Sequence, residues 1–370
     1  MKVLFINSVC GIGSTGKICG ALAEEYVAQG HEAVIAYGRD GNVPERYRKF
    51  AHRIGGDLGV KVSALRTRVL DDHGFANEAA TKRFLQWAES YDPDFLWLHN
   101  IHGYYIHVGM LFDWIKSRPG MQVRWTLHDC WSFTGHCAHF TYSKCDRWKT
   151  GCFRCPEKKN YPASSCLDNS RINYARKKAA FTGVKNLTIE VPSRWLKELV
   201  QQSFLGEYPV EVRYTTIDTA TFRPTAGDFR QKHGLEGKKV ILGVAGVWTE
   251  RKGLGDFLKL REILDEEHAI VLVGLDEQQL SDLPNDILGI SRTANPRELA
   301  EIYSAADVFF NPTYEDNLPT VNLEAESCGT RVITYNTGGC AETVHRENSR
   351  VIPVGAYEQL PGLLEDALRD

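Results

Sequence analysis

Residues 307–329 read DVFFNPTYEDNLPTVNLEAESCG and predict a short strand that runs through a turn into a helix. The aromatic, apolar run at 307–310 is typical of a buried strand. Asp316 and Asn317 are favoured helix N-cap residues, and Pro319 suits the first helical turn. The stretch therefore predicts a strand–turn–helix unit with polar residues at the junction.

On such a helix Thr320 and Glu324 fall on one face, because they are four residues apart. Free backbone N–H groups at Leu318 and Thr320 suit a diphosphate, since a helix N-terminus attracts anions. A carboxylate one turn further along can accept hydrogen bonds from sugar hydroxyls. Two interpretations follow: a nucleoside diphosphate site, or an ordinary capped helix with a solvated Glu324.

The composition is that of a soluble globular protein large enough for two domains. The chain has 370 residues, of which 43% are hydrophobic and 25% charged. There is no repeat, and no apolar run approaches the roughly 20 residues of a membrane span. The N-terminus, MKVLFINSVCGIG, passes from a strand into a glycine turn and does not resemble a signal peptide. A cytoplasmic protein is expected.

Charge is distributed unevenly along the chain. Lys and Arg outnumber Asp and Glu over residues 1–195, and the reverse holds afterwards. Basic residues gather at 44–70 and 144–178. One interpretation is contact with an anionic membrane surface or a phosphorylated acceptor, and the other is solvated helix faces. Nucleic acid is not expected, because no nucleic-acid motif accompanies the charge.

A first Rossmann-like domain is predicted over residues 1–210. Strand 2–9 leads into Gly11, Gly13 and Gly16, then a helix and a second strand at 32–38. The glycine spacing matches a dinucleotide fingerprint, and Arg39 could suit a 2′-phosphate, so an NADP-dependent oxidoreductase is an alternative. A loop that closely approaches an acceptor also needs glycines.

Two further strands of this domain end in histidines. Strand 95–101 delivers His99 and His102, and strand 122–129 delivers His128 beside Asp129. Ligands bind at the carboxyl ends of strands in open α/β sheets. A site role is predicted for His128, and structural roles for His99 and His102.

Residues 130–166 form a cysteine-rich insert that interrupts the α/β pattern. Cys152 and Cys155 have a knuckle spacing, and Cys137 and Cys145 could complete a tetrahedral zinc site, with Cys130, His136 and Cys166 as competing ligands. Four thiolates would make this zinc structural, because no open coordination position remains. Reduced buried thiols are the alternative.

A second Rossmann-like domain is predicted over residues 211–370. Strand 239–247 is followed by Arg251 and Lys252, at the carboxyl edge where two cations can neutralise a diphosphate. The same topology places 317–324 at that edge. Two independent features therefore converge on one nucleotide site. A final helix is predicted at 357–368.

With these residues in place, the chain resembles the retaining glycosyltransferases of family four. The resemblance rests on the glycine loop, Thr126-Leu127-His128-Asp129, Ser193-Arg194-Trp195, Arg251-Lys252-Gly253, AADVFFNPTYED, LEAESCGTRVI and TGG. It implies the GT-B fold, with two facing Rossmann-like domains, parallel sheets and a C-terminal helix. The insert resembles that of a bacterial capsule and exopolysaccharide subgroup.

The resemblance implies roles for individual residues. Glu324 would bind the donor ribose, Lys252 the diphosphate, and His128 the transferred sugar. The family's paired acidic motif maps onto Asp316 and Glu324, with Glu315 beside the first member, and either Asp316 or Glu315 would orient the sugar. The chain departs from the family where Val247, rather than Arg, follows Gly246, and Arg251 is the candidate substitute.

The implied activity is transfer of a sugar, with retention, from a nucleoside diphosphate donor to a saccharide or lipid-linked saccharide acceptor in polysaccharide biosynthesis. The first domain would hold the acceptor through the Gly11, Gly13 and Gly16 loop, peripherally on the inner face of the membrane, and no catalytic metal is required. A non-enzymatic, zinc-stabilised scaffold is the remaining alternative. The donor base, sugar and linkage are not encoded in these motifs.

Overall fold

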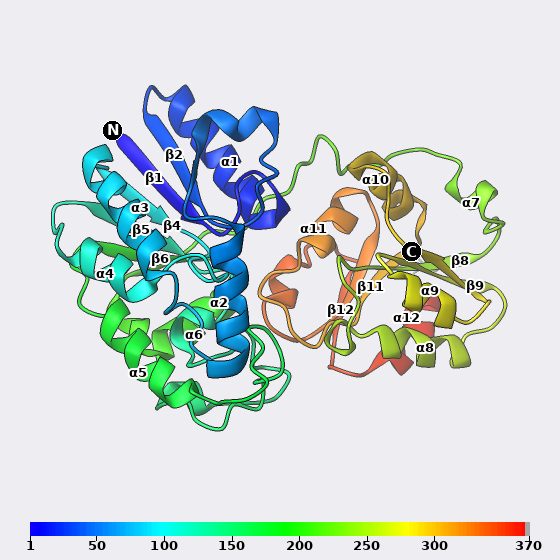
Figure 1. The fold of residues 1–370 in the computed structure, drawn as a ribbon. Coiled ribbons are helices and arrows are strands. Elements are labelled where there is room, and N and C mark those ends of the chain that lie inside the picture. Colours follow the sequence, from blue (N-terminus) through cyan, green and yellow to red (C-terminus); the bar gives the residue numbers. More distant parts are fainter. Residues whose placement is uncertain (367–370) are drawn as a thin grey trace. The chain divides into compact units, whose positions relative to one another are not determined.

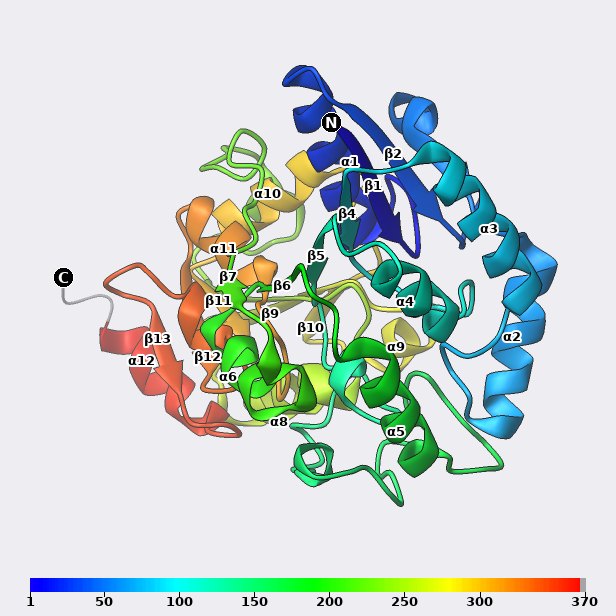
Figure 2. The same ribbon diagram turned by 90° about the vertical axis from the view of Figure 1, so that its left-hand side faces the viewer.

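The computed structural model describes residues 1–366 and divides into two compact units, Met1–Arg213 and Tyr214–Asp370. The division falls three residues after the predicted boundary at 210, because the short strand Val210–Val212 pairs with the sheet of the first unit. Each unit is a parallel sheet covered by helices on both faces (Figures 1 and 2). The predicted class, two Rossmann-like α/β domains, is confirmed.

The first unit has a seven-stranded sheet in the order β3-β2-β1-β4-β5-β6-β7, with every pairing parallel. Its strands are β1 (Lys2–Asn7), β2 (Glu32–Tyr37), β3 (Ala51–Arg53), β4 (Phe95–Leu98), β5 (Gln122–Thr126), β6 (Leu187–Val191) and β7 (Val210–Val212). Its helices are α1 (Gly13–Ala28), α2 (Asp57–Leu70), α3 (Glu78–Tyr91), α4 (Val108–Lys116), α5 (Ser170–Phe181) and α6 (Arg194–Gln202).

Alternation along the central strands divides the core of this unit into two layers. Leu4 and Ile6 of β1 pack with α3, α4 and α5, whereas Val3 and Phe5 pack with α1. Successive side chains of a strand point to opposite faces, so both faces of this apolar strand are buried. The carboxyl ends of the strands are left to carry polar side chains.

The second unit repeats this topology with six parallel strands in the order β10-β9-β8-β11-β12-β13. The strands are β8 (Lys239–Val244), β9 (His268–Val273), β10 (Ile287–Ile290), β11 (Val308–Asn311), β12 (Arg331–Tyr335) and β13 (Arg350–Ile352). The helices are α7 (Phe229–Lys232), α8 (Leu254–Ile263), α9 (Glu277–Asp282), α10 (Pro296–Ala305), α11 (Thr320–Ser327) and α12 (Leu360–Asp366).

The described end of the C-terminal helix agrees in part with the prediction at 357–368. Residues 357–359 form a 3-10 turn and α12 covers 360–366, whereas 367 and 368 lie outside the described residues. Leu360 and Leu364 pack with α8 on one face of the sheet, and α10 and α11 cover the other face.

The cysteine-rich insert contains two short 3-10 turns, 131–133 and 147–149. Its end caps helix α2, because the N–H groups of Ser165 and Leu167 donate to the carbonyls of Arg68 and Val69, at 2.8 and 3.2 Å. The Asn169 side chain donates to the next carbonyl, that of Leu70. Carbonyls that a helix end leaves unsatisfied are thus paired by the end of the insert and the residues just after it, which fixes α2 in place.

Candidate donor site and the residues around His128

The predicted donor residues lie at the point where the strand order of the second unit reverses. Strands β8 and β11 are neighbours at the centre of the sheet, and their connections run outward in opposite directions. Open α/β sheets bind ligands at the carboxyl ends of the strands beside such a reversal. Lys252 follows β8 and Asp316 follows β11, so both extend from this edge.

Two ion pairs join the two loops at this edge. Lys252 Nζ lies 2.5 Å from Asp316 Oδ2, and Arg251 Nη1 lies 3.5 Å from Glu315 Oε2. Lys252 and Asp316 keep 29% and 21% of their side-chain surface exposed, whereas Glu315 keeps only 3%. The structure thus brings the four predicted residues together in two cation–carboxylate pairs. Arg251 is 36% exposed, so both cations and Asp316 are accessible to a ligand, whereas Glu315 is not.

Backbone contacts hold the two loops together. Tyr314 N donates to Arg251 O at 2.8 Å. Gly253 has φ +78°, and a Cβ there would lie 2.2 Å from Pro312 O. Because only glycine tolerates this conformation and this approach, Gly253 sets the distance between the loops.

A third loop, following β12, closes on Asp316. Gly339 N donates to Asp316 O at 3.1 Å, and a Cβ on Gly338, which has φ +54°, would lie 1.8 Å from the same oxygen. The residue that follows Gly339, Cys340, is fully buried. The TGG segment noted in the sequence therefore supports the acidic residue of the site.

The helix begins later than the sequence predicted. Helix α11 starts at Thr320, with Pro319 at the N-cap position, and Asp316 is not its cap. The Asp316 carboxylate instead accepts from Leu318 N at 3.3 Å, so that N–H is occupied in this structure. The reason is that Asp316 is held by Lys252 and Gly339, which shifts the first helical turn along the chain.

Glu324 lies four residues after Thr320 on the same face of α11, as predicted. It is half-buried, and its Oε2 accepts from the Tyr303 hydroxyl at 3.2 Å. Tyr303 is fully buried, and burial followed by the Glu324 charge raises its pKa well above the usual value. Tyr303 therefore stays a hydrogen-bond donor and orients the carboxylate.

In the first unit, His128 follows β5 and contacts His99, which follows β4. His99 Nδ1 and His128 Nε2 lie 3.1 Å apart, and the rings are stacked. Burial lowers the pKa of His128 to about 4, partly offset by Asp129, so the imidazole is neutral at physiological pH. A neutral imidazole can both donate and accept a hydrogen bond. The structural role predicted for His99 holds, because it is buried and supports His128.

The three glycines of the first loop differ in their surroundings. A Cβ on Gly11 would lie 2.4 Å from Tyr47, and one on Gly16 would lie 3.0 Å from Val9. Gly13 has φ +61° with nothing within 4 Å of a Cβ. Gly11 and Gly16 thus serve packing, and only Gly13 faces open space. Its acceptor role stays a prediction.

The sequence predicts only a structural role for His102 and no role for Tyr161, but the structure joins the two side chains beside Asp129. His102 Nε2 lies 2.9 Å from Asp129 Oδ2, and His102 Nδ1 lies 3.0 Å from the Tyr161 hydroxyl. Tyr161 belongs to the cysteine-rich insert, which therefore reaches the carboxyl edge of the sheet. His102 was visible in the sequence as a strand-end histidine, but no sequence signal linked it to Tyr161.

The structure does not support the predicted zinc site. Cys137, Cys145, Cys152 and Cys155 line one small cavity. Yet among residues 1–366 no three His, Cys, Asp or Glu side chains are arranged to hold a metal ion. Cys137 and Cys155 instead share a thiol hydrogen bond, and Cys152 Sγ accepts from Gly135 N at 3.1 Å. Burial raises the pKa of the Cys152 thiol to about 11, whereas the hydrogen bond with Cys137 lowers the pKa of Cys155.

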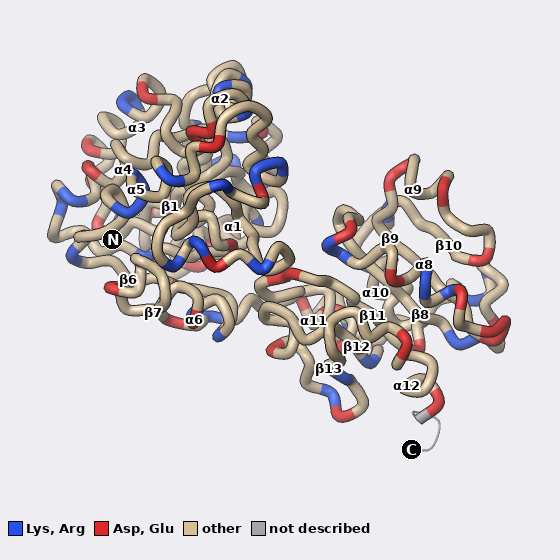
Figure 3. The backbone as a smooth tube through the Cα atoms, turned by 90° about the horizontal axis from the view of Figure 1, so that it is seen from below, with Lys and Arg blue, Asp and Glu red and all other residues tan. Residues whose placement is uncertain are grey.

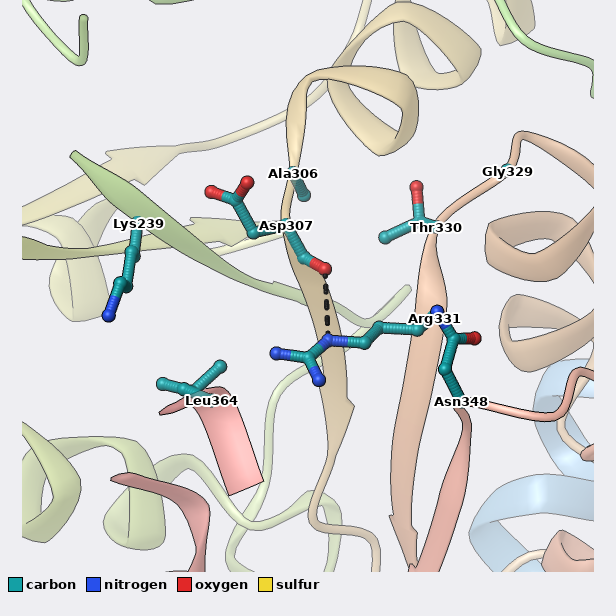
Figure 4. Close-up of a pocket in the computed structure, with 8 residues that line it drawn as sticks. All are labelled: Lys239, Ala306, Asp307, Gly329, Thr330, Arg331, Asn348 and Leu364. Carbon is teal, nitrogen blue, oxygen red and sulfur yellow. Dashed lines mark hydrogen bonds between the residues drawn. The ribbon is translucent and has the colours of Figure 1, made fainter. Parts of the chain in front are cut away.

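A cavity of about 220 Å³ lies at the opposite, amino-terminal edge of the second sheet (Figure 4). It is lined by residues at the starts of β8, β11 and β12, including Lys239, Asp307 and Arg331. Arg331 donates to the carbonyls of Asp307 and Leu363, at 3.4 and 3.1 Å. Two of its N–H groups are therefore used within the fold, and the cavity lies away from the ligand-binding edge.

Comparison with known proteins identifies both units. The family model described as "Glycosyl transferase 4-like domain" matches residues 13–165, and "Glycosyl transferases group 1" matches residues 226–370. The chain belongs to the family-four glycosyltransferases. The match to both units leaves the oxidoreductase interpretation of the glycine loop without support.

Two curated relatives are each 26% identical to this chain. One is the putative colanic acid biosynthesis glycosyl transferase WcaC of Escherichia coli K12, matched over 70% of the chain and 64% of the relative. The other is a D-inositol 3-phosphate glycosyltransferase of Corynebacterium jeikeium, matched over 62% and 58%. The matched region thus spans roughly three fifths of the length of these relatives.

Solved structures share the fold at low sequence identity. Sucrose-phosphate synthase of Thermosynechococcus elongatus has a TM-score of 0.69 at 17% identity, covering 100% of this chain and 90% of that one. The Anabaena protein Alr3699/HepE in complex with UDP has a TM-score of 0.66 at 15% identity, with the same coverage. These similarities confirm the GT-B fold class. Within residues 1–366, no helix is both long and apolar enough to cross a membrane.

Proposed function

We propose that this glycosyltransferase transfers a sugar, with retention at the anomeric carbon, from a nucleoside diphosphate donor to a saccharide or lipid-linked saccharide acceptor in polysaccharide biosynthesis. The observation that carries the proposal is the accessible Lys252–Asp316 pair at the strand-order reversal of the second unit, with Glu324 one turn into the adjoining helix. The Anabaena protein forms complexes with UDP and with UDP-glucose, which supports this donor class.

In this proposal the donor diphosphate replaces the carboxylates as the partner of the two cations of the site. Lys252 binds the diphosphate, with Arg251 beside it, and the N-terminal N–H groups of α11 add a partial positive charge. As the bond to the sugar breaks, negative charge grows on the diphosphate, so fixed cations stabilise the transition state more than the ground state. Glu324 accepts hydrogen bonds from the donor ribose.

The carboxylate released by Lys252 then faces the sugar. Asp316, or its neighbour Glu315, orients the sugar hydroxyls, and the more exposed Asp316 is the better placed of the two. His128 supplies a neutral hydrogen-bonding group toward the transferred sugar, and Gly13 gives the acceptor close access to the backbone. No step of this reaction calls for a catalytic metal.

The proposal is tested with a panel of sugar nucleotides and the full-length protein. Release of nucleoside diphosphate from one donor, with an α-linked product from an α-linked donor, supports it. Absence of turnover and of nucleotide binding across UDP, GDP, TDP and ADP sugars would favour the non-enzymatic scaffold.

We also propose that helix α2 places the first unit on an anionic membrane. Its four most exposed apolar side chains, Leu58, Val62, Leu65 and Val69, are 44–78% exposed and recur every three or four residues. At 100° per residue they form one stripe, opposite the face that buries Ser63 and Thr67 against the unit.

Basic residues flank this apolar stripe on both sides. Lys61 and Arg68 lie on one side of it, and Arg66, which forms an ion pair with Asp72 at 2.5 Å, lies on the other. All three are exposed, in a first unit rich in Lys and Arg (Figure 3). An apolar stripe between cations fits the interface of an anionic bilayer, where each cation contributes roughly 1 kcal/mol.

Vesicle sedimentation tests the membrane proposal. The protein should sediment with vesicles containing phosphatidylglycerol and remain free with phosphatidylcholine alone. Replacing Leu58, Val62, Leu65 and Val69 by Ser should abolish sedimentation, whereas Ile172→Ser, which removes a 57% exposed apolar side chain from α5, should not. Equal sedimentation of the two variants would contradict the role of α2.

A further inference from the structure

An exposed aromatic pair lies at the carboxyl edge of the first sheet, apart from the donor residues. Tyr104 follows β4 and Tyr161 comes from the cysteine-rich insert, with ring centroids 6.2 Å apart in an edge-to-face arrangement. Tyr161 is 40% exposed and Tyr104 is half-buried. Neither ring is needed to fill the core, so their placement calls for another explanation.

We propose that Tyr104 and Tyr161, with Arg39 and the His102–Asp129 pair, bind the acceptor and select a pyranose that carries an anionic group. This inference rests on the proposed glycosyl transfer and adds the chemistry of its acceptor. A pyranose presents an apolar face of C–H groups to an aromatic ring and hydroxyls at its rim. Aromatic walls with a few fixed polar groups suit such a ligand.

The backbone at Tyr104 is held in a conformation that non-glycine residues rarely adopt. Tyr104 has φ +70°, and Gly103 before it has φ +117°. The Asn77 side chain donates a hydrogen bond to Tyr104 O and stabilises this conformation. Such backbone strain persists only where neighbouring groups impose it, and it is concentrated at ligand-binding sites. The fold thus uses strain to present this ring.

Polar groups beside the rings are fixed in a chain. The Tyr161 hydroxyl lies 3.0 Å from His102 Nδ1, and His102 Nε2 lies 2.9 Å from Asp129 Oδ2. Asp129 Oδ1 also accepts from Trp131 N at 2.8 Å. Both ring nitrogens of His102 are used in this chain, whereas Asp129 keeps 15% of its side-chain surface exposed, so its carboxylate can still accept from a ligand hydroxyl. A carboxylate held in place by His102 gives the orientation that aromatic contact alone lacks.

The floor beneath the rings is His73, which is 2% exposed. Its ring lies 4.5 Å from that of Tyr104 and 5.6 Å from that of Tyr161. Its Nε2 accepts from Gly103 N at 3.2 Å, but its Nδ1 has no hydrogen-bond partner among the described residues. Buried polar atoms are rarely left unpaired, so this atom points to a ligand or a water that it shares with one.

The preference for an anion comes from Arg39. Its guanidinium lies 5.9 Å from the Tyr104 ring centre, and its side chain packs across Gly103. It is exposed and forms no ion pair with any residue in the described part of the chain. An uncompensated guanidinium beside a sugar-sized aromatic surface favours a carboxylate or a phosphate on that sugar, because its planar fork matches either group.

Nuclear magnetic resonance titration of the full-length protein, with its tyrosine rings labelled, tests this site directly. The ligands are methyl glucuronide, glucose 1-phosphate, methyl glucoside and inorganic phosphate. We expect at least one anionic sugar to shift the Tyr104 and Tyr161 signals with a Kd at least tenfold below that of the glucoside. The glucuronide and the sugar phosphate together show whether a carboxylate or a phosphate is preferred.

Variants assign the effect to the named residues. Arg39→Ala should remove the preference for the anionic sugars, and Tyr161→Ala should weaken binding of all three sugars. Tyr142→Ala, which removes a 45% exposed tyrosine from the same insert, should change neither. Melting temperatures confirm that the variants are folded, and Tyr161→Phe, which keeps the ring, should retain most of the binding.

Three outcomes would overturn the inference: no shift with any sugar, equal affinity for the glucoside, or inorganic phosphate binding as tightly as the anionic sugars. UDP, GDP, TDP and ADP titrated into the same samples keep the two proposals distinct. Nucleotide binding without sugar binding would refute this acceptor site alone. If none of UDP, GDP, TDP and ADP bound the unmodified protein, the donor proposal would be refuted instead.

Discussion

Replacing Lys252 by Ala separates a role in catalysis from a role in folding. Lys252 Nζ lies 2.5 Å from Asp316 Oδ2, and the two side chains are 29% and 21% exposed. A partly exposed pair of this kind contributes about 0–1 kcal/mol to the free energy of unfolding, after discounting for solvent screening. The variant should therefore fold and melt close to the unmodified protein.

Its effect on turnover should be far larger. A fixed cation facing charge that develops in a transition state typically stabilises it by about 2.7–4 kcal/mol, which corresponds to a roughly 100- to 1,000-fold fall in kcat. The assay follows release of nucleoside diphosphate, with the best donor of the panel held at saturation. Lys252→Arg should recover part of the activity, because it restores the charge with a different geometry.

Lys259→Ala provides a matched control. Lys259 lies on α8, and its Nζ is 3.4 Å from Asp256 Oδ1 in a similar lysine–aspartate contact away from the donor edge. Its kcat should be within about twofold of the unmodified protein, since it faces no ligand. A Lys252→Ala variant that turns over as fast as Lys259→Ala would refute the assignment of Lys252 to the diphosphate.

Three further predictions follow from other contacts. Glu324→Gln should raise the donor KM roughly tenfold or more without lowering the melting temperature, because an amide oxygen replaces a charged acceptor for the ribose. Glu326→Gln on the same helix is the control. Equal donor KM values in these two variants would contradict the role of Glu324. Gly338→Ala should lower both stability and activity, since a Cβ there would lie 1.8 Å from Asp316 O. Gly237→Ala, also at positive φ but with open space around a Cβ, should lower stability alone. Full activity in Gly338→Ala would show that this loop does not support Asp316. Burial lowers the pKa of Lys177 to about 7, below its value in the unfolded state, so the unfolded state binds more protons above pH 7. The free energy of unfolding should therefore rise from pH 7 to about 8.5, with a slope of up to about 1.4 kcal/mol per pH unit. Lys177→Met should flatten that slope in urea titrations, and an unchanged slope would show that Lys177 is not its cause.

Much of the fold could be predicted because its signals are local. Strands such as Lys239–Val244 and Val308–Asn311 are apolar runs bounded by turn residues, and parallel sheets bury such runs on both faces. Placing Lys252 and Asp316 together needed only the rule that parallel strands end at one edge. The family resemblance then supplied the roles.

Other features depend on contacts between residues far apart in the chain. The start of α11 moved to Thr320 because Gly339, from the loop after β12, holds Asp316. Helix α9 was missed because its six residues, EQQLSD, carry a single large apolar side chain and no periodicity. Tyr161 meets His102 across 59 residues of sequence.

The stripe on α2 illustrates a different limit of sequence reasoning. An amphipathic helix is ordinarily expected to face its apolar side inward. Here Ser63 and Thr67 face the unit, whereas Leu58 and Leu65 are 78% and 66% exposed. Only the structure shows which face is buried, because the insert caps this helix and sets its rotation.

The central claim is that the carboxyl edge of the second unit binds a nucleoside diphosphate. Isothermal titration of UDP, GDP and NADPH into the full-length protein and into Lys252→Ala tests it most directly. One nucleoside diphosphate should bind the unmodified protein at one site per chain and bind the variant at least tenfold more weakly, while NADPH does not bind. Binding of NADPH alone, or equal diphosphate affinity in the two proteins, would contradict the claim.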